Sequence, residues 1–471
     1  MVFSSLAFIC AFLPLSFLLH QVIPGIRGKN ALLILVSLLF YAYGEPVYVL
    51  LMIASTLFNW GFGLLVGRSR VHSGARKAWL GLAVVVNIGL LGVFKYAGML
   101  VDTVNALAHL SIPSPGIALP IGISFYTFQA LSYVIDVYRG DVEPQSSYPT
   151  VLLYISFFPQ LIAGPIVKYH DVESQLSSRH ADLRDIAAGF RRFCIGLGKK
   201  VLIANVMAVA VDSVFAADLS HINVAGAWIA ALAYLMQIYF DFSGYSDMAI
   251  GMARMFGFTY QENFKYPYAS STVKEFWRRW HISLSTWFKL YVYIPLGGNR
   301  KGRPRAVVNK LAVFFLCGLW HGASWTFVIW GLIHGLFLLL EEYIPMRKLP
   351  RPLGIVYTLL VVTVAFVLFR ADTFEQGGWI IAQMFTGWHF DYASVELALR
   401  QLTPLFVGTF AFALLAATPV KGAIERRLDD APDGVVGAAE MASYLFALAL
   451  LVLSMLSLSG GGYNPFIYFR F

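Results

Sequence analysis

Charged residues are scarce in this chain of 471 residues. Asp, Glu, Lys and Arg make up 13% of it, whereas an ordinary soluble domain is about a quarter charged. Hydrophobic residues reach 58%, and the mean hydropathy is +0.67. This composition excludes most soluble classes and indicates a membrane protein. The net charge of +9 would suggest nucleic acid in a soluble chain, but here we expect basic loops facing the cytoplasm and no nucleic-acid partner.

Cysteine is also rare. Cys10, Cys194 and Cys317 occur singly in apolar surroundings without CxxC spacing, so we expect buried thiols, no disulfide and no metal site. The chain contains no GxSxG, HExxH, Walker A or GxGxxG motif. Hydrolase, metalloprotease, nucleotide-hydrolysing and dinucleotide-dependent functions therefore have no local support.

Long apolar runs are abundant. Because a bilayer core needs about 20 apolar residues per helix, we expect an all-α polytopic protein with about 11 transmembrane helices plus re-entrant or interfacial pieces. The first run lacks preceding basic residues and a following cleavage pattern, so we expect it to remain as a span. The runs are 2–23, 30–43, 47–66, 79–94, 119–137, 148–166, 201–215, 225–240, 307–320, 325–340, 354–369, 402–417 and 441–458.

The charged loops predict an orientation. Basic residues gather near 25–29 and 67–78, so the positive-inside rule places these loops, and with them the later loop at 139–147, in the cytoplasm and the N-terminus outside. The polar stretch 168–200 is expected to form amphipathic cytoplasmic helices against the membrane. The two halves of the chain share no recurring motif, which argues against a transporter or flippase, although inverted repeats can be invisible in sequence.

The segment 258–310 carries most of the net charge, with ten basic residues against two acidic ones. Within it, one set of mainly aromatic residues and one set of mainly cationic residues each recur at steps of three and four, which predicts an amphipathic helix. Two interpretations fit its charge: contact with anionic lipid at the cytoplasmic face, or binding of the phosphates of a donor such as coenzyme A. The aromatic face holds Trp277, Trp280, Leu284, Trp287 and Tyr291, and the cationic face holds Lys274, Arg278, His281, Ser285 and Lys289.

His321 lies in an apolar run that has no charged residue from 312 to 340. An ionisable group at membrane depth is costly and normally faces the interior with a function, but a satisfied packing histidine is an equal alternative. Gly318 and Gly322 would allow another helix or a substrate to approach closely. His334 would point roughly 140° away from His321 on a continuous helix, so we expect it to serve packing.

A third group of polar residues ends another apolar run. Asp241, Ser243, Tyr245 and Asp247 alternate within 241–247 and could line a tunnel or orient a histidine. The alternative is an ordinary helix break in which Asp241 caps the following helix and Gly244 allows a bend.

Several strings together resemble the membrane-bound O-acyltransferase family, and the resemblance runs over nearly the whole chain. It is most similar to members that O-acetylate alginate, peptidoglycan or other exopolysaccharides, and less similar to the D-alanyl transferases of teichoic acids. The strings are Met1-Val2-Phe3-Ser4-Ser5, Leu119-Pro120-Ile121-Gly122-Ile123-Ser124-Phe125-Tyr126, Asp241-Phe242-Ser243-Gly244-Tyr245-Ser246-Asp247, Glu275-Phe276-Trp277-Arg278-Arg279-Trp280-His281-Ile282-Ser283-Leu284-Ser285, Gly297-Gly298-Asn299-Arg300, Leu319-Trp320-His321-Gly322 and Tyr463-Asn464-Pro465-Phe466-Ile467-Tyr468-Phe469.

The resemblance implies one membrane-embedded acyltransferase domain over 1–471, in which helices ring a funnel and a tunnel. His321 matches the family's catalytic histidine, and His281 matches a second polar position that is often essential. The implied reaction moves an acetyl group from a cytosolic thioester, acetyl-coenzyme A or a carrier protein, to a hydroxyl outside. Arg278, Arg279 and Lys289 would bind the donor's phosphates. No tightly bound cofactor is expected; the expected partners are a periplasmic transferase, a polysaccharide acceptor and anionic lipid.

Overall fold

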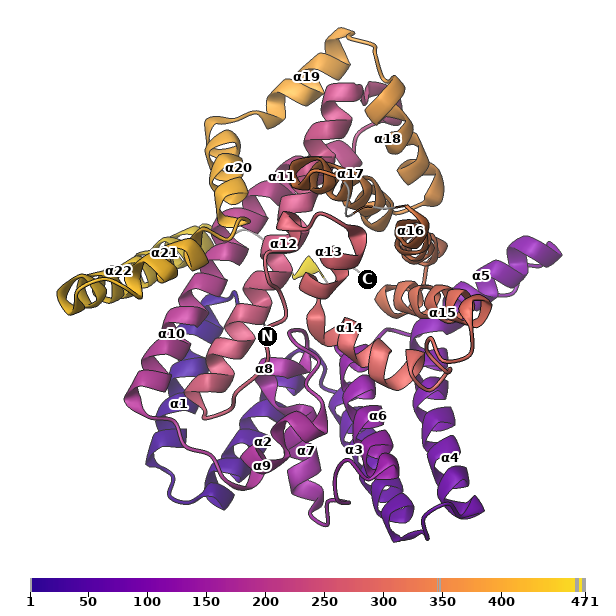
Figure 1. Ribbon diagram of the computed structural model, residues 1–471, viewed down its shortest axis with the longest axis vertical. Helices are drawn as coiled ribbons and strands as arrows, with labels where there is room; N and C mark the ends of the chain where they lie inside the picture. Colours follow the sequence, from indigo (N-terminus) through magenta and orange to yellow (C-terminus); the bar gives the residue numbers. More distant parts are fainter. Residues whose placement is uncertain (1, 345, 347–348, 462–465, 468–471) are drawn as a thin grey trace. The chain divides into compact units, whose positions relative to one another are not determined.

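Long apolar segments favour helices in a membrane, because a helix satisfies its backbone hydrogen bonds internally. The computed structural model describes residues 2–344, 346, 349–461 and 466–467, and all regular structure within them is helical (Figure 1). The predicted all-α fold is therefore confirmed. Of the resembling strings, Met1 and most of 463–469 lie outside the described residues.

Eight helices in these residues are long and apolar enough to cross a membrane, or nine if the bent pair Tyr392–Gln401 and Pro404–Ala416 counts as one span. The estimate of about 11 exceeds this number because some apolar runs give shorter helices. Phe8–Val22 is too short for an upright span. The run 148–166 breaks at Phe157, whose extended backbone separates two short helices.

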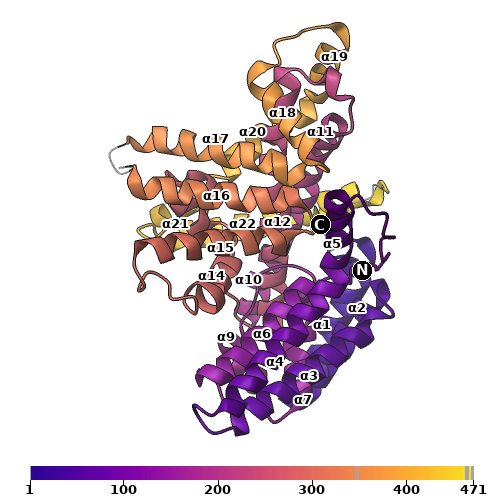
Figure 2. The same cartoon turned by 90° about the vertical axis from the view of Figure 1, so that its right-hand side faces the viewer.

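Packing divides the chain into two compact units. Unit 1 comprises Met1–Phe193 and Ser246–Gln261. Within it, α3, α4 and α6 lie side by side (Figure 2). Its helices are α1 (Leu13–Val22), α2 (Ile26–Gly44), α3 (Tyr48–Arg68), α4 (Gly74–Leu91), α5 (Ala97–Ala108), α6 (Ile123–Arg139), α7 (Tyr148–Ser156), α8 (Phe158–Leu161), α9 (Tyr169–Ser177) and most of α10 (Leu183–Gly198).

Unit 2 comprises Cys194–Tyr245 and Glu262–Phe471 and contains both histidines of interest. The helices α15, α16 and α17 pack in sequence order (Figure 2). Its helices are α11 (Asn205–Phe215), most of α12 (Val224–Met255), α13 (Val273–Arg279), α14 (Ile282–Phe288), α15 (Arg303–His321), α16 (Trp325–Tyr343), α17 (Arg351–Arg370), α18 (Phe374–Thr386), α19 (Tyr392–Gln401), α20 (Pro404–Ala416), α21 (Val420–Leu428) and α22 (Asp433–Ser459).

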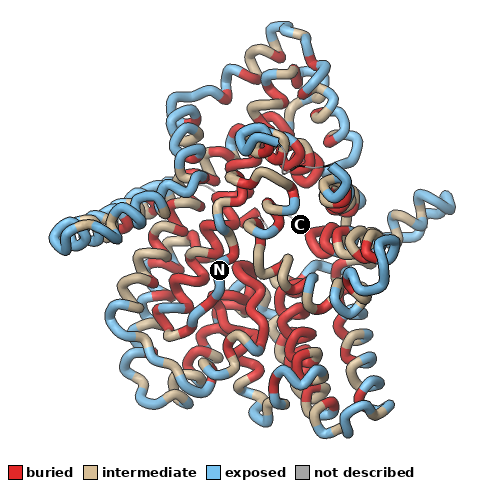
Figure 3. The backbone as a smooth tube through the Cα atoms, viewed as in Figure 1, coloured by how far each residue is buried: buried red, intermediate tan, exposed pale blue. Residues whose placement is uncertain are grey.

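Burial is uneven among the spans. About two thirds of the most apolar window of α12 is buried, 67%, against 11% for α22, so α12 is an interior helix and α22 faces the surroundings (Figure 3). An apolar, exposed helix such as α22 is suited to lipid contact. A polar or charged group that is buried on an interior helix such as α12 needs a partner.

The polar stretch 168–200 leads into a longer helix. α10 continues through a π-helical turn, η3 (Lys199–Ala204), into α11, and Leu183–Phe215 as a whole is a candidate span, so the cytoplasmic placement of 168–200 stays a prediction. The buried side chains of α10 include Phe193 and Leu197, so this helix has one face towards the protein interior. Among the thiols, Cys194 and Cys317 are buried as predicted, whereas Cys10 is exposed. Where such an apolar helix contacts lipid, the exposed thiol needs no hydrogen-bond partner.

Candidate active site

The amphipathic segment is two short helices instead of one. α13 ends at Arg279, and α14 begins at Ile282, because His281 adopts a left-handed backbone with φ 44°. The backbone N–H of Ile282 donates to the carbonyl of Asn263 at 2.9 Å and holds the break. The five residues of the predicted aromatic face are all buried, which confirms that part of the pattern.

The break changes the position of His281. A continuous helix would place it among the exposed cations, but its side chain is fully buried, so that prediction is wrong. A left-handed non-glycine residue is strained and persists only where its surroundings fix it. Here the bond to Asn263 fixes it, and the imidazole turns into the interior of unit 2.

His321 is the last residue of α15, and the extended Gly322 ends the helix. Gly318 lets α15 approach α16 closely, because a Cβ there would lie within 3.0 Å of the backbone at Phe327 and Val328. A side chain at Gly322 would likewise collide with the ring of Phe327. The predicted role of both glycines in close approach is confirmed.

The two histidines come together inside unit 2. Their ring centroids are 6.4 Å apart, and the rings are inclined by 64°. Aromatic side chains surround them: Trp330 lies 5.0 Å and Phe369 5.2 Å from His321, and Phe242 lies 4.5 Å from His281. His321 is 5% exposed. Two imidazoles in an apolar enclosure can exchange protons with a bound group while water is kept out.

Hydrogen bonds fix the tautomer of His281. The backbone N–H of Ser283 donates to Oδ1 of Asn263 at 3.2 Å, which identifies that atom as the amide oxygen. Nδ1 of His281 lies 3.3 Å from the same oxygen, so it must carry the proton and donate. Nε2 then has a lone pair, and among the described residues it is buried without a hydrogen-bond partner. Nε2 can therefore accept a hydrogen bond from a bound ligand.

Burial lowers the pKa of His281 to about 3, so the ring is neutral near pH 7. An unfolded histidine has a pKa of about 6.5. As the pH falls from there towards 3, the unfolded chain takes up a proton that the folded chain does not, and the stability of the fold declines. We expect the unfolding temperature in detergent to fall more between about pH 7 and pH 4.5 for the wild type than for His281→Gln. Equal losses would contradict this assignment.

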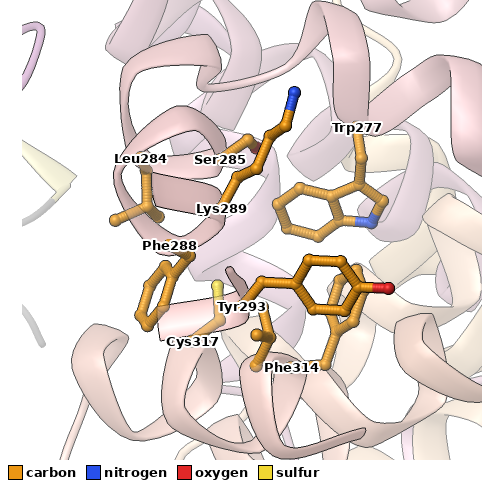
Figure 4. A pocket seen from close by; sticks show the side chains of 9 residues that line it. Trp277, Leu284, Ser285, Phe288, Lys289, Tyr293, Phe314 and Cys317 are labelled. Carbon is orange, nitrogen blue, oxygen red and sulfur yellow. The ribbon is translucent and has the colours of Figure 1, made fainter. Parts of the chain in front are cut away.

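A pocket of about 150 Å³ is lined by residues that lie one helical turn along the chain from each histidine. Cys317, in its wall, is one helical turn before His321, and Leu284 is one turn after His281. In Figure 4 the rings of Trp277 and Tyr293 lie close together, and the amino end of Lys289, the cation of the lining, points away from the other labelled side chains. The lining residues are Trp277, Leu284, Ser285, Phe288, Lys289, Tyr293, Val313, Phe314 and Cys317.

Two polar atoms at this pocket are available to form hydrogen bonds with a ligand. Nε1 of Trp277 and Oγ of Ser285 are buried, and neither has a hydrogen-bond partner in the part of the chain that the structure describes. Buried polar atoms are nearly always satisfied by protein, water or ligand. An apolar pocket with a few convergent polar groups and one cation has the character of a site for a flexible, partly polar ligand.

The three predicted donor-binding cations do not share one place. Lys289 lines the pocket, whereas Arg278 and Arg279 are not in its lining. Arg279 forms an ion pair with Glu275 at 2.7 Å. Burial opposes ionisation of Glu275, but bonds from Ser271 and the charge of Arg279 lower the pKa of this carboxyl overall. Arg278 is exposed.

The polar string 241–247 lies within α12, which continues unbroken, so the helix-break alternative is wrong. Asp241 forms a buried ion pair with Lys200, and Asp247 pairs with Arg192 at 2.8 Å in unit 1. Neither carboxylate has a bond to a histidine among the described contacts. Ser243 is buried, and the ring of Tyr245 packs on that of Phe466 at a tilt of 33°, with ring centroids 4.4 Å apart.

His334 contacts the same aromatic cluster as His321. It packs 5.1 Å from Trp330 and 5.2 Å from Trp277 and is fully buried. The packing role expected for it agrees with these contacts, although α15 ends at His321 and the two histidines lie on separate helices. Sequence reasoning missed Asn263, Trp330 and Lys200. Asn263 could have been noticed as an asparagine between apolar segments, and Lys200 as a lysine at the start of an apolar run.

The fold and this site define a polytopic helical membrane protein with two neighbouring buried histidines and a small pocket on the adjoining helical turns. Residues 143–370 match the model of MBOAT, the membrane-bound O-acyltransferase family. The chain is 41% identical to the probable alginate O-acetylase AlgI of Azotobacter vinelandii and 41% identical to that of Pseudomonas putida, over 100% of each chain. It is 37% identical to the peptidoglycan O-acetyltransferase of Helicobacter pylori, over 80% of this chain and 78% of the relative. The chain belongs to the membrane-bound O-acyltransferase family and is an acyltransferase.

Proposed function

We propose that this protein transfers an acetyl group from acetyl-coenzyme A to a hydroxyl acceptor for O-acetylation of an exopolysaccharide such as alginate. The neighbouring pair of buried histidines, with the pocket at Lys289 on the adjoining helical turns, is the observation that carries the proposal. The relatives named for alginate and peptidoglycan O-acetylation support this class of acceptor. Peptidoglycan or another envelope glycan is the second acceptor class, and an acyl-carrier protein is the second donor.

His321 acts as the general base. A sugar or carrier hydroxyl has a pKa far above 7, so its proton must leave as its oxygen attacks the thioester carbonyl. The new O–C bond forms, the C–S bond breaks, and the imidazole passes the proton to the departing thiolate. The thiolate is a good leaving group, so little acid assistance is needed. A transient acyl-imidazole on His321 is the stepwise alternative to direct transfer.

His281 positions a reactant by accepting a hydrogen bond. Its Nε2 carries the lone pair, because Nδ1 donates to Asn263. An acceptor nitrogen can hold an amide N–H of the donor arm or the acceptor hydroxyl. Polarising the thioester carbonyl would need an N–H at the same place, so positioning is the better supported role for His281.

The pocket receives the arm of the thioester donor. Its apolar walls suit the alkyl parts of such an arm, while Trp277 and Ser285 can bond its polar groups. Lys289 is placed to bind a phosphate or carbonyl oxygen as a point charge. Arg278 and Arg279 would then contact the more distant phosphates outside the pocket.

Charge reversal tests the donor site. We expect Lys289→Glu to raise the KM for acetyl-coenzyme A about tenfold or more, because a hydrogen bond to a charged group contributes roughly 1.5–3 kcal/mol. Arg278→Glu with Arg279→Glu should raise it too, with a steep dependence on salt. Lys301→Glu, outside the pocket lining, is the matched control. An unchanged KM in both variants would mean that these cations set topology or contact lipid.

The proposed setting is the bacterial inner membrane, with the N-terminus in the periplasm and the basic loops in the cytoplasm. The donor would then enter from the cytoplasm and the acceptor from outside. We infer that a separate periplasmic transferase carries the acetyl group on to the polymer. Membrane vesicles with this transferase omitted should still release coenzyme A when a small hydroxyl acceptor replaces it.

A further inference from the structure

A buried ion pair connects two interior helices of unit 2. Nζ of Lys200 lies 2.6 Å from Oδ1 of Asp241, and the two side chains are 5% and 2% exposed. Gly244 makes the approach of η3 to α12 possible, because a Cβ there would lie 2.7 Å from the carbonyl oxygen of Gly196 and 3.1 Å from the backbone nitrogen of Lys200. Charges at membrane depth are costly, and a buried pair adds little net stability. We therefore expect the pair to have a role other than stabilising the fold.

Asp241 has a second partner far along the chain. Its Oδ2 accepts the backbone N–H of Ile467 at 2.7 Å, across 226 residues of sequence. The preceding side chain, Phe466, packs on the same helix: its ring lies 4.4 Å from Tyr245 and 6.0 Å from Phe242. Phe466 and Ile467 are both buried. In Figure 1 the yellow segment that follows α22 lies beside α12.

The docked segment reaches the histidine pair through one ring. Phe242 separates Phe466 from His281, with its centroid 6.0 Å from the first and 4.5 Å from the second. Its ring meets the imidazole edge to face, at 85°. Phe242 thus contacts the segment, His281 and the ring of Phe264, which lies 5.0 Å away, and loss of the segment would remove one of these supports. A shift of about 1 Å at such a site can lower a rate by about 10²-fold.

We propose that Lys200 and Asp241 anchor the segment Phe466–Ile467 and thereby hold Phe242 against His281 during acyl transfer. The carboxylate supplies a strong acceptor for the backbone N–H, and the lysine neutralises the carboxylate so that it can be buried. Neither residue touches the reactants, so both are positioning residues. This inference rests on the proposed function for its effect on rate, but the docking itself does not depend on the reaction.

The sharpest test removes this N–H with a proline, which also restricts the backbone at Phe466. Ile467→Pro deletes the donor to Asp241, whereas Ile467→Ala retains it and is the matched control. We expect Ile467→Pro to lower kcat with acetyl-coenzyme A by about 10- to 100-fold with little change in the donor KM. Ile467→Ala should remain within about threefold of the wild type. A fold that was merely loosened would lower the amount of active enzyme equally in both variants.

A second measurement follows the docking without the reaction. Tyr245→Cys with Phe466→Cys, in a Cys10→Ala background, should be joined by a short bifunctional thiosulfonate within one chain. The linkage should form with Ile467→Ala and be lost with Ile467→Pro or with the double change Lys200→Met and Asp241→Ala. Linkage that persists in these variants, or a kcat for Ile467→Pro equal to that of the control, would overturn the proposal. If the wild type itself turns over no thioester, the proposed function fails and the positioning role with it, while the linkage still decides the docking.

Discussion

Replacing His321 by glutamine is expected to lower kcat for acetyl transfer by about 10²- to 10⁴-fold, the usual contribution of a general base. Glutamine keeps the size and polarity of the side chain but cannot take the proton from the attacking hydroxyl. The KM for the thioester should change little, because the donor pocket is lined by other residues. The measurement is coenzyme A release by purified protein in proteoliposomes with a hydroxyl acceptor.

His334→Gln is the matched control for this variant. His334 is also a buried histidine and packs against the same Trp330, but the proposal gives it no part in proton transfer. Its replacement should cost stability before it costs turnover. If the two glutamine variants lost activity equally, or if His321→Gln kept the wild-type rate, the assignment of His321 as the base would be wrong.

Breaking the buried ion pair is expected to have the largest effect on stability. Lys200→Met leaves the carboxylate of Asp241 buried without its cation, which typically costs about 3–5 kcal/mol. Adding Asp241→Asn removes the charge while keeping an acceptor for the N–H of Ile467, so the double variant should recover much of the loss. Equilibrium unfolding in detergent of both single variants and the double one gives the coupling free energy.

The outcome that opposes this expectation is simple additivity. If Lys200→Met and Asp241→Asn each lower stability slightly and their effects add, the two charges do not depend on one another. The pair Arg254 and Asp185 provides a comparison within the same protein, since its side chains are 50% and 39% exposed. Its disruption should change stability by no more than about 1 kcal/mol.

The length of the apolar runs predicts the membrane helices, and α2, α3, α16 and α17 lie where such runs occur. Prediction from periodicity fails for segments in which a tertiary contact overrides the local pattern. The step of three and four through 274–291 predicts one helix, but the bond between Ile282 and Asn263 imposes a left-handed residue at His281. The same override moves this histidine from the exposed face to the interior.

The site itself was only partly accessible from sequence. His321 could be singled out because it is an ionisable residue in a run without charge. The partner of Asp241 could not be found in this way, because the lysine lies 41 positions earlier on another helix and the backbone donor 226 positions later. The tautomer of His281 likewise depends on the placement of Asn263, 18 positions away, which no spacing rule predicts.

The central claim is that His321 enables a hydroxyl to take the acyl group of a thioester inside the membrane. The most direct measurement uses proteoliposomes with acetyl-labelled coenzyme A added on one side and a hydroxyl acceptor sealed on the other. We expect label on the enclosed acceptor and free coenzyme A on the donor side, both lost in His321→Gln and retained in His334→Gln. Label that enters as intact acetyl-coenzyme A, or ester formation that continues without His321, would contradict the account.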